Sequence, residues 1–134
     1  MDFSTLEPGH ELFSRRITVA SDSVAAYLAA VDDRTSTYAQ EGIVPPMAVA
    51  ALVMSQALKA IELPAGAVHI GQELGFQAAV DVGADVDCSA RVVQNSVRRG
   101  TRFMALEITA GVGEAKALTG RVSLAIPEGL EGEE

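Results

Sequence analysis

The sequence has only one cysteine, Cys88, which cannot close an internal disulfide. Its amino terminus, MDFSTLEPGHELF, has neither the basic start nor the apolar core of a signal peptide. The longest apolar run begins near Val44 and is broken from Ser55 onward, so it lacks the roughly 18 to 20 uninterrupted apolar residues of a membrane helix. We therefore expect a cytoplasmic protein without a membrane span, in which this run forms a buried helix.

Basic side chains are also scarce, because 10 Lys and Arg stand against 18 Asp and Glu, for a net charge of −8. This charge repels a phosphate backbone, which makes nucleic acid a poor candidate partner. The sequence has no glycine-rich phosphate loop, no metal-ligand cluster and no Gly-x-Ser-x-Gly elbow. We therefore expect neither a metal nor a resident cofactor.

The length of 134 residues fits one domain with a continuous core. The final segment, EGLEGEE, consists mainly of glycine and glutamate and has little to bury. We expect a single domain over residues 1–127 and a flexible acidic tail over residues 128–134.

The first quarter of the chain predicts a strand, a helix and a loop. Apolar and polar residues alternate over residues 11–19, as in a half-buried strand. Ser21 is a good N-cap for a short amphipathic helix that ends near Asp32, because apolar residues follow it at helical spacing. The polar residues 32–42 are rich in turn formers and predict a loop.

Residues 44–63 open with two prolines, which fit the first turn of a helix, and continue with residues that are apolar on nearly every side. We expect such a helix to be enclosed. Strands follow at residues 67–77, 86–95, 102–110 and 115–126. The last three have apolar faces made of Val86, Cys88, Ala90 and Val92, of Met104, Leu106, Ile108 and Ala110, and of Leu118, Val122, Leu124 and Ile126.

These elements predict an α+β hot-dog fold. A sheet with one dry face and a single long apolar helix are most simply combined if the sheet wraps around that helix. We therefore expect an antiparallel, curved sheet of about five strands wrapped around one long central helix. Such a sheet leaves edge strands that must be paired or covered, so we do not expect a monomer.

The segment DDRTSTYAQEGIVPPMAVAAL resembles the part of MaoC-like hydratases that has an Asp, then a His, and later a His-Gly-Met motif that opens the central helix. The following segment, VHIGQELGFQAAVDVGADV, is similar to the N-terminal, non-catalytic half of FAS1-like dehydratases, with a His-x-x-Gln motif, an aromatic residue and a Val-Gly turn. The resemblance covers roughly residues 8 to 127. The matching positions are Asp33 for the acid, Tyr38 for the first histidine, and His69, Gln72, Phe76 and Gly83 in the second segment.

The resemblance also shows what this chain lacks. In the hydratases the Asp and His hold the attacking water, and a backbone N–H at the start of the helix polarises the thioester oxygen. Tyr38 is a poor substitute for histidine, because an unperturbed phenol has a pKa of about 10. Pro46 stands in the place of the usual glycine and has no N–H. The resemblance implies that Pro46 and Met47 line a substrate site without its own catalytic pair.

Three further positions have both a functional and a structural interpretation. Asp33 is either a residual base or, as its polar loop favours, a solvated or helix-capping carboxylate. His69 is predicted on the strand face of Gly71, where it would flank an acyl or pantetheine channel or lie at an interface or surface. Gln72 is predicted on the opposite, apolar face, where it needs a partner. We expect it to fix the loop before the long helix.

Arg98, Arg99 and Arg102 bracket a predicted hairpin glycine. Three cations near one turn could hold the phosphates of coenzyme A, although a solvated turn explains them as well. Cys88 lies on the apolar face of its strand, and a buried thiol is generally inert.

The leading hypothesis is a subunit that binds acyl thioesters on coenzyme A or an acyl carrier protein, within a hydratase or dehydratase of the hydro-lyase type. It would pair with an Asp/His-bearing hot-dog subunit and would not be catalytic by itself; coenzyme A or phosphopantetheine would enter only as part of the substrate. One alternative is an active homodimeric enoyl-CoA hydratase or acyl-CoA thioesterase that uses Asp33 or His69. Another is a non-enzymatic ligand-binding or scaffold domain.

Overall fold

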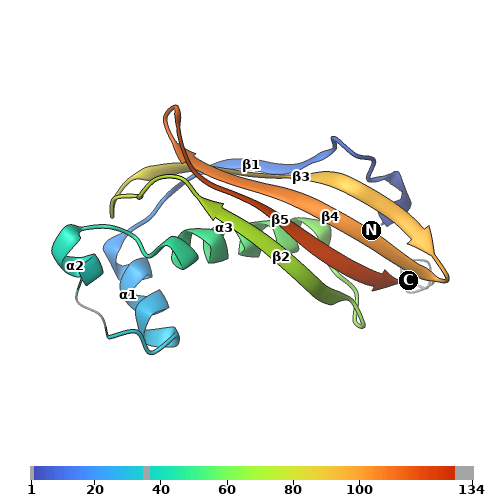
Figure 1. Cartoon of the computed structure of the whole chain (residues 1–134), viewed down its shortest axis with the longest axis horizontal. Coiled ribbons are helices and arrows are strands. Elements are labelled where there is room, and N and C mark those ends of the chain that lie inside the picture. The colour runs from blue at the N-terminus through green and yellow to red at the C-terminus, as the bar shows by residue number, and fades with distance from the viewer. Residues whose placement is uncertain (1, 35–36, 129–134) are drawn as a thin grey trace.

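The computed structural model describes residues 2–34 and 37–128. One curved sheet of five antiparallel strands has the order β1-β3-β4-β5-β2, and the long helix α3 lies along its concave side (Figure 1). This arrangement confirms the predicted α+β hot-dog fold. The elements are a 3-10 turn (Phe3–Thr5), β1 (Glu11–Thr18), α1 (Ser21–Ala30), α2 (Thr37–Glu41), α3 (Pro46–Ile61), β2 (Val68–Phe76), β3 (Asp85–Arg98), β4 (Thr101–Val112) and β5 (Ala115–Pro127).

The core lies between the concave face of the sheet and α3. Side chains alternate between the two faces of each strand, so the predicted apolar faces of β3, β4 and β5 all turn toward the helix. All twelve predicted side chains of these faces are buried. Ten of them have relative exposures of 0% or 1%: Val86, Cys88, Ala90, Val92, Leu106, Ile108, Leu118, Val122, Leu124 and Ile126. The other two, Met104 and Ala110, are 2% exposed. The sequence pattern therefore predicted the dry face correctly.

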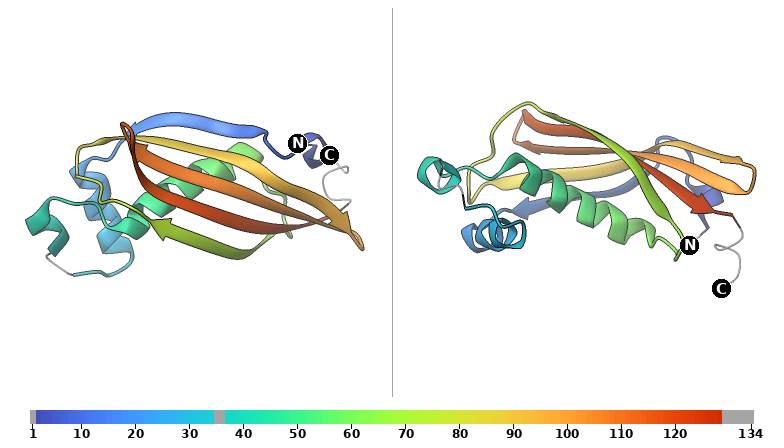
Figure 2. Two further views of the ribbon diagram at one scale, coloured as in Figure 1. Left: turned by 45° about the horizontal axis from the view of Figure 1, so that its top comes forward. Right: turned by 60° about the horizontal axis from the view of Figure 1, so that its bottom comes forward.

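The prediction that α3 is enclosed is wrong for the single chain. Val49, Ala50 and Val53 lie on the side of α3 that is buried against the sheet. Met47, on another side, is 46% exposed, and Leu58 is half-buried. A single five-stranded sheet curves over only one side of a helix, as Figure 2 shows. Packing within one chain therefore does not explain why the other side of α3 is also apolar.

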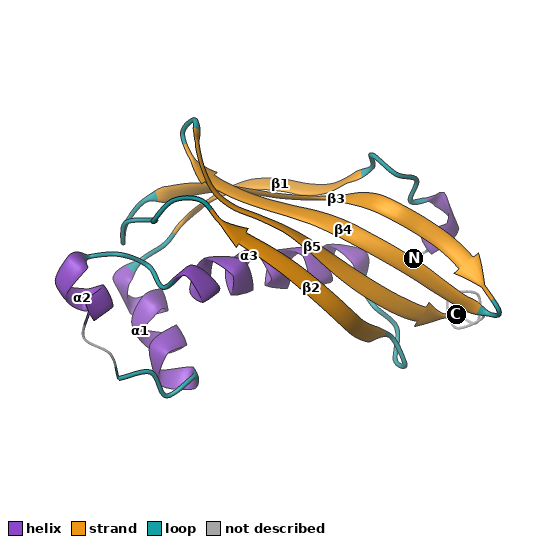
Figure 3. Ribbon diagram, viewed as in Figure 1, coloured by secondary structure: helices purple, strands orange, loops and turns teal. Residues whose placement is uncertain are grey.

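Several predicted boundaries differ from the structure. The polar stretch expected to be a loop contains the short helix α2, and Ile43 after it forms an isolated bridge with Asp81 (Figure 3). Helix α1 begins at Ser21, but its N-cap is Ala20, which has no capping side chain. Strand β3 continues to Arg98, so the hairpin turn is shorter than predicted. Residues 35–36 lie outside the described residues.

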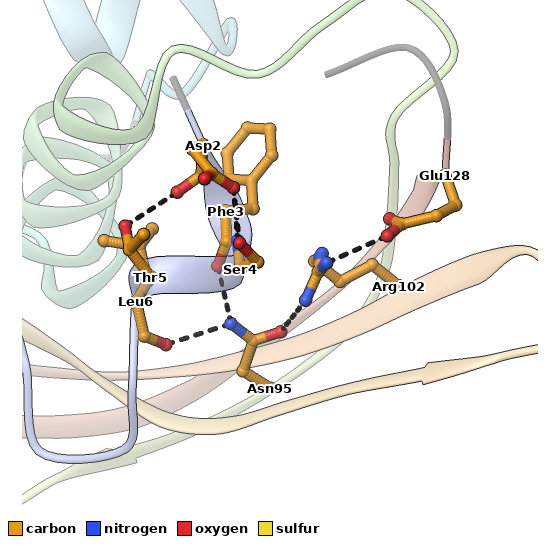
Figure 4. Close-up of polar contacts among 8 residues, drawn as sticks. All are labelled: Asp2, Phe3, Ser4, Thr5, Leu6, Asn95, Arg102 and Glu128. Atoms are coloured by element: carbon orange, nitrogen blue, oxygen red, sulfur yellow. Dashed lines mark hydrogen bonds and ion pairs between the residues drawn. The ribbon is translucent and has the colours of Figure 1, made fainter. Parts of the chain in front are cut away.

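A buried polar network closes the end of the sheet at the β3–β4 hairpin (Figure 4). Asn95 donates from Nδ2 to the carbonyl oxygens of Phe3 at 2.8 Å and Leu6 at 2.9 Å. Arg102 is 5% exposed and donates to Asn95 Oδ1 at 2.8 Å and to Glu128 Oε1 at 3.0 Å. Glu128, which we assigned to a flexible tail, therefore belongs to the folded domain. The rest of that predicted tail, residues 129–134, lies outside the described residues.

Candidate functional site

An apolar pocket of about 290 Å³ lies between α1, α2 and the segment that leads into α3. We call it the α1–α2 pocket. Aliphatic side chains form most of its wall, and Tyr38 contributes the one aromatic ring. Its lining residues are Ser21, Val24, Ala25, Leu28, Tyr38, Gly42, Ile43 and Val82. A space of this size and polarity suits the hydrocarbon part of a small ligand.

A second pocket of about 280 Å³, the α1–α3 pocket, lies between β1, α1 and the first two turns of α3. Val24 lines both pockets, and Tyr27 and Leu52 line the second. A smaller cavity of about 40 Å³ lies on the other side of the helix start, between Pro46 and Phe76. The amino-terminal end of α3 is therefore surrounded by apolar space, in the region where the resemblance predicted a substrate site.

The start of α3 also presents a backbone donor. Pro45 is the N-cap, and its carbonyl oxygen accepts from the N–H groups of Ala48 at 2.9 Å and Val49 at 3.4 Å. Pro46 has no N–H, as expected. The N–H of Met47 makes no hydrogen bond to another described residue. The donor that the glycine would have provided is absent, while the next N–H along the helix is available to a ligand.

The two residues at the predicted acid and histidine positions are placed differently from each other. Tyr38 is half-buried and lines the α1–α2 pocket. Asp33 is not among the residues that line it, and its backbone N–H donates to the Leu28 carbonyl at 2.9 Å, which terminates α1. The structure thus brings Tyr38, but not Asp33, to the wall of this pocket.

Strand β2 is an edge strand, and a β-bulge between His69 and Gly71 changes which residues share a face. His69 pairs with Leu124 and Gln72 pairs with Val122, both of which point into the core. Directly opposed residues of antiparallel strands share a face. His69 and Gln72 therefore both lie on the concave face, which corrects our prediction that His69 shares the face of Gly71. One extra residue at a bulge reverses the alternation on one side of it.

The prediction that Gln72 fixes the loop before α3 is wrong for the single chain. Gln72 is exposed, and its side chain makes no hydrogen bond to another described residue. His69 is exposed as well, and its Nε2 lies 3.0 Å from the Gly71 carbonyl oxygen, to which it donates. Both side chains remain accessible because no strand covers the outer edge of β2.

The three arginines do not form one cation cluster. Arg102 belongs to the buried network with Asn95 and Glu128. Arg98 lies over the ring of Phe103, with Cζ 5.3 Å from its centroid. Arg99 occupies the turn with a φ of 53° and is exposed. Two exposed cations remain at the hairpin, and Arg102 has a structural role.

Cys88 is a buried thiol, and the acidic side chains of the described residues form no metal-ligand cluster. Burial raises the pKa of the Cys88 thiol to about 11, so it is protonated at neutral pH, as predicted for an inert thiol. Within residues 2–34 and 37–128, no three His, Cys, Asp or Glu side chains gather as metal ligands. No helix of the described chain is both long and apolar enough to cross a membrane.

Sequence reasoning missed most of the pocket wall. Ile43 and Val82 come from segments that we had treated as connections, and they line the α1–α2 pocket together with Val24. The sequence contains one indication: Ile43 and Val82 are apolar residues among neighbours in the sequence that are mostly polar or small. The pocket depends on how α2 folds back toward α1, which a periodic pattern does not encode.

No family model and no curated protein matches the sequence. Solved structures do match its fold. The (R)-hydratase from A. caviae involved in PHA biosynthesis is 24% identical over 92% of this chain and 98% of its own, with a TM-score of 0.75. A MaoC-like dehydratase from Rhodospirillum rubrum is 13% identical over 93% of this chain and 95% of its own, with a TM-score of 0.72. A chain of the ChsH1–ChsH2 complex from Mycobacterium tuberculosis is 14% identical over 90% of this chain and 98% of its own, with a TM-score of 0.72.

The class that the fold defines is therefore the hot-dog proteins, with the architecture seen in MaoC-like dehydratases and (R)-hydratases. Its structural neighbours include a subunit of a complex of two different proteins. A shared fold does not by itself assign chemistry, which has to be argued from the site.

Proposed function

We propose that this chain is an acyl-thioester-binding hot-dog subunit of a hydratase or dehydratase, and that it is not catalytic by itself. The observation that carries the proposal is the start of α3. Two apolar pockets of about 290 and 280 Å³ share Val24 as a lining residue, and the second reaches the first two turns of α3. The Met47 N–H at this helix start has no described partner, and Tyr38, at the position that the resemblance matches to histidine, lines the first pocket. This arrangement offers binding without a group that exchanges protons near neutral pH.

Each part of the arrangement suits one part of the ligand. The apolar pockets would take the acyl chain, because burying a methylene group contributes about 0.8 kcal/mol. The Met47 N–H would donate to the thioester oxygen, which the positive end of the helix dipole also attracts. Arg98 and Arg99 would meet the phosphates of coenzyme A only if the carrier extends along the sheet to the hairpin.

The acid and base would come from a second hot-dog subunit that has the Asp and His. The ChsH1–ChsH2 complex, which is by its name an assembly of two proteins, gives a precedent for such pairing in this fold. The unpaired outer edge of β2 provides a surface for it. The protein would then act in the cytoplasm as one half of the enzyme.

A repair experiment tests the assignment of the site. The double variant Tyr38→His, Pro46→Gly restores a group that titrates near neutral pH and a backbone N–H at the helix start. We expect it to hydrate crotonyl-CoA at a rate measurable above the parent, and we expect each single variant to remain inactive. Hydration is followed by the loss of the enoyl-thioester absorbance.

The control places the histidine at another position of the same apolar region: Tyr27→His, combined with Pro46→Gly, lies on the wall of the α1–α3 pocket and not at the position matched to histidine. It should gain no activity. If the double variant folds and binds the thioester but stays as inactive as the parent, the site assignment is wrong.

A further inference from the structure

Helix α1 borders both apolar pockets, and one of its side chains lines both. The α1–α2 pocket is lined by Ala25 and Leu28 of this helix, and the α1–α3 pocket by Ser23 and Tyr27. Among the described residues, Val24 is the only one that lines both pockets. Successive residues of an α-helix are about 100° apart around its axis, because a turn has about 3.6 residues. By this geometry Val24 lies between the face that carries Leu28 and the face that carries Tyr27.

The two pockets are also neighbours on the side opposite α1. Val82 lines the α1–α2 pocket, and Val19 lines the α1–α3 pocket. Backbone hydrogen bonds hold these two segments together: the Gly83 N–H donates to the Val19 carbonyl oxygen at 2.7 Å, and the Val19 N–H donates to the Ala84 carbonyl oxygen at 3.0 Å. A side chain that lines both pockets therefore stands at the boundary between them.

Val24 is held in place at this boundary. It is 8% exposed and belongs to the hydrophobic core. Its backbone N–H donates to the Ala20 carbonyl oxygen at 3.2 Å, in the first turn of α1. A valine side chain in a helix strongly prefers one χ1 rotamer, because it is branched at Cβ. Val24 therefore does not swing aside as an unbranched side chain would.

We propose that Val24 is a partition that keeps one acyl chain from extending through both pockets, and that it thereby sets the longest acyl group bound with full affinity. The inference rests on the proposed function, because it concerns the acyl chain of the same thioester. That function assigns the acyl chain to the apolar pockets, and the partition restricts it to one pocket at a time.

The volumes of the pockets give the expected limit. A methylene group takes about as much space as a water molecule, roughly 30 Å³, so a pocket of about 290 Å³ is full at about ten carbons. The α1–α3 pocket, of about 280 Å³, has nearly the same capacity. The substrate class is therefore acyl thioesters of up to about ten carbons, whichever pocket is filled. Joining the pockets would nearly double the space for one chain.

The partition predicts how affinity depends on chain length. Each methylene group that enters an apolar pocket lowers the Kd about three- to fourfold. Methylene groups beyond a filled pocket stay in water and lower the Kd no further. The Kd should therefore fall with chain length and then level off. The length at which it levels off measures the space that a single chain can fill.

The experiment measures the Kd of saturated acyl-CoAs from butyryl-CoA to tetradecanoyl-CoA, in steps of two carbons and below the micelle concentration of each ligand. We expect the Kd of the unmodified chain to level off by decanoyl-CoA. In Val24→Ala it should continue to fall, so that tetradecanoyl-CoA binds about tenfold or more tightly than to the unmodified chain. Circular dichroism checks that the variant is folded.

The matched control, Val82→Ala, makes the same chemical change in the wall of the α1–α2 pocket alone. It adds room for about two carbons, so the levelling-off should move by one step of the series at most. The double variant Val24→Ala, Ala51→Leu fills part of the α1–α3 pocket again and should return the profile toward that of the unmodified chain. Val24→Cys removes one branch of the side chain and should shift the profile less, and it replaces Val24→Ala if that variant does not fold.

Each contrary result is specific. If the unmodified chain binds acyl-CoA and the folded Val24 variants have the same profile, the inference is overturned while the proposed function stands. An equally large shift in Val82→Ala, or a double variant that keeps the profile of Val24→Ala, also overturns it. If the unmodified chain binds no acyl-CoA of any length, the proposed function fails and the inference fails with it.

Discussion

The two ends of the sheet show opposite solutions to burial. At the β3–β4 hairpin, the buried Arg102 donates hydrogen bonds to Asn95 and Glu128, and Asn95 donates to the carbonyl oxygens of Phe3 and Leu6. At the start of α3, apolar side chains line two open pockets of about 290 and 280 Å³. A buried polar network restricts the positions of its partners, whereas an apolar pocket offers space to the hydrocarbon part of a ligand. We infer that the hairpin end stabilises the fold, and we propose that the α3 end binds the ligand.

The largest expected effect is at the hairpin end. Arg102→Ala removes hydrogen bonds from a buried cation to Asn95 and Glu128, and we expect the free energy of unfolding to fall by about 3 kcal/mol. Arg98→Ala, on the same hairpin, should lower it by about 0.5 to 1 kcal/mol, because it removes only a contact with Phe103. Urea unfolding measures both. Equal losses would refute the assignment of Arg102 to a structural network.

The next effect concerns the amino-terminal segment. Asn95→Ala removes both hydrogen bonds to the carbonyl oxygens of Phe3 and Leu6, and we expect a loss of about 2 kcal/mol. Hydrogen exchange should become faster in residues 3–10 than in β4 and β5. Uniformly faster exchange throughout the sheet would show that the network supports the whole core, not this segment.

The third prediction concerns the α3 end and separates ligand binding from stability. Ala25→Leu adds three carbons to the wall of the α1–α2 pocket, and we expect the Kd of butyryl-CoA to rise about tenfold, equivalent to about 1.4 kcal/mol. Stability should change by less than about 0.5 kcal/mol. Ala26→Leu, one residue further along α1, lines none of the three cavities and should leave the Kd unchanged. Equal Kd values for the two variants would place the ligand elsewhere.

The smallest effect is expected at Cys88. With its pKa raised to about 11 by burial, the thiol should react negligibly with a thiol reagent at pH 7.5 in the folded protein and rapidly after unfolding. Because the folded-state pKa lies above the ordinary value, its contribution to stability is complete below about pH 9 and is lost as the pH rises toward 11. Fast labelling at pH 7.5 would show that β3 opens readily.

The fold could be predicted from the sequence because it follows from periodicity. Two patterns in the sequence are local. Apolar and polar residues alternate along β3, β4 and β5, which identifies the buried face of each strand, and the long apolar run identifies α3 as the core helix. The bulge in β2 could not be predicted this way. The residue types around Ile70 fit a regular strand in which side chains alternate between two faces, so nothing in the sequence marks the extra residue. It moved His69 to the concave face.

The candidate site was predicted only in part. Tyr38, Pro46 and Met47 were identified through a motif. Pro46 and Met47 begin α3, and Tyr38 of α2 lines the α1–α2 pocket. The role of Arg102 was not recognised, because no local sequence pattern marks Asn95, across the same hairpin, or Glu128, at the end of β5, as its partners. We predicted that α3 is buried on all sides, and this is wrong for the single chain. The sequence shows that a helix face is apolar, but it does not show whether the same chain covers that face.

The most direct test of the account measures binding and turnover on one preparation of the unmodified chain. Butyryl-CoA is titrated calorimetrically, and hydration of crotonyl-CoA is followed under the same conditions. We predict saturable binding of butyryl-CoA together with turnover far below about 1 per second, the lower end for working enzymes. Turnover above that rate would contradict the claim that the chain is non-catalytic by itself. Absence of any binding would contradict the claim that it holds an acyl thioester.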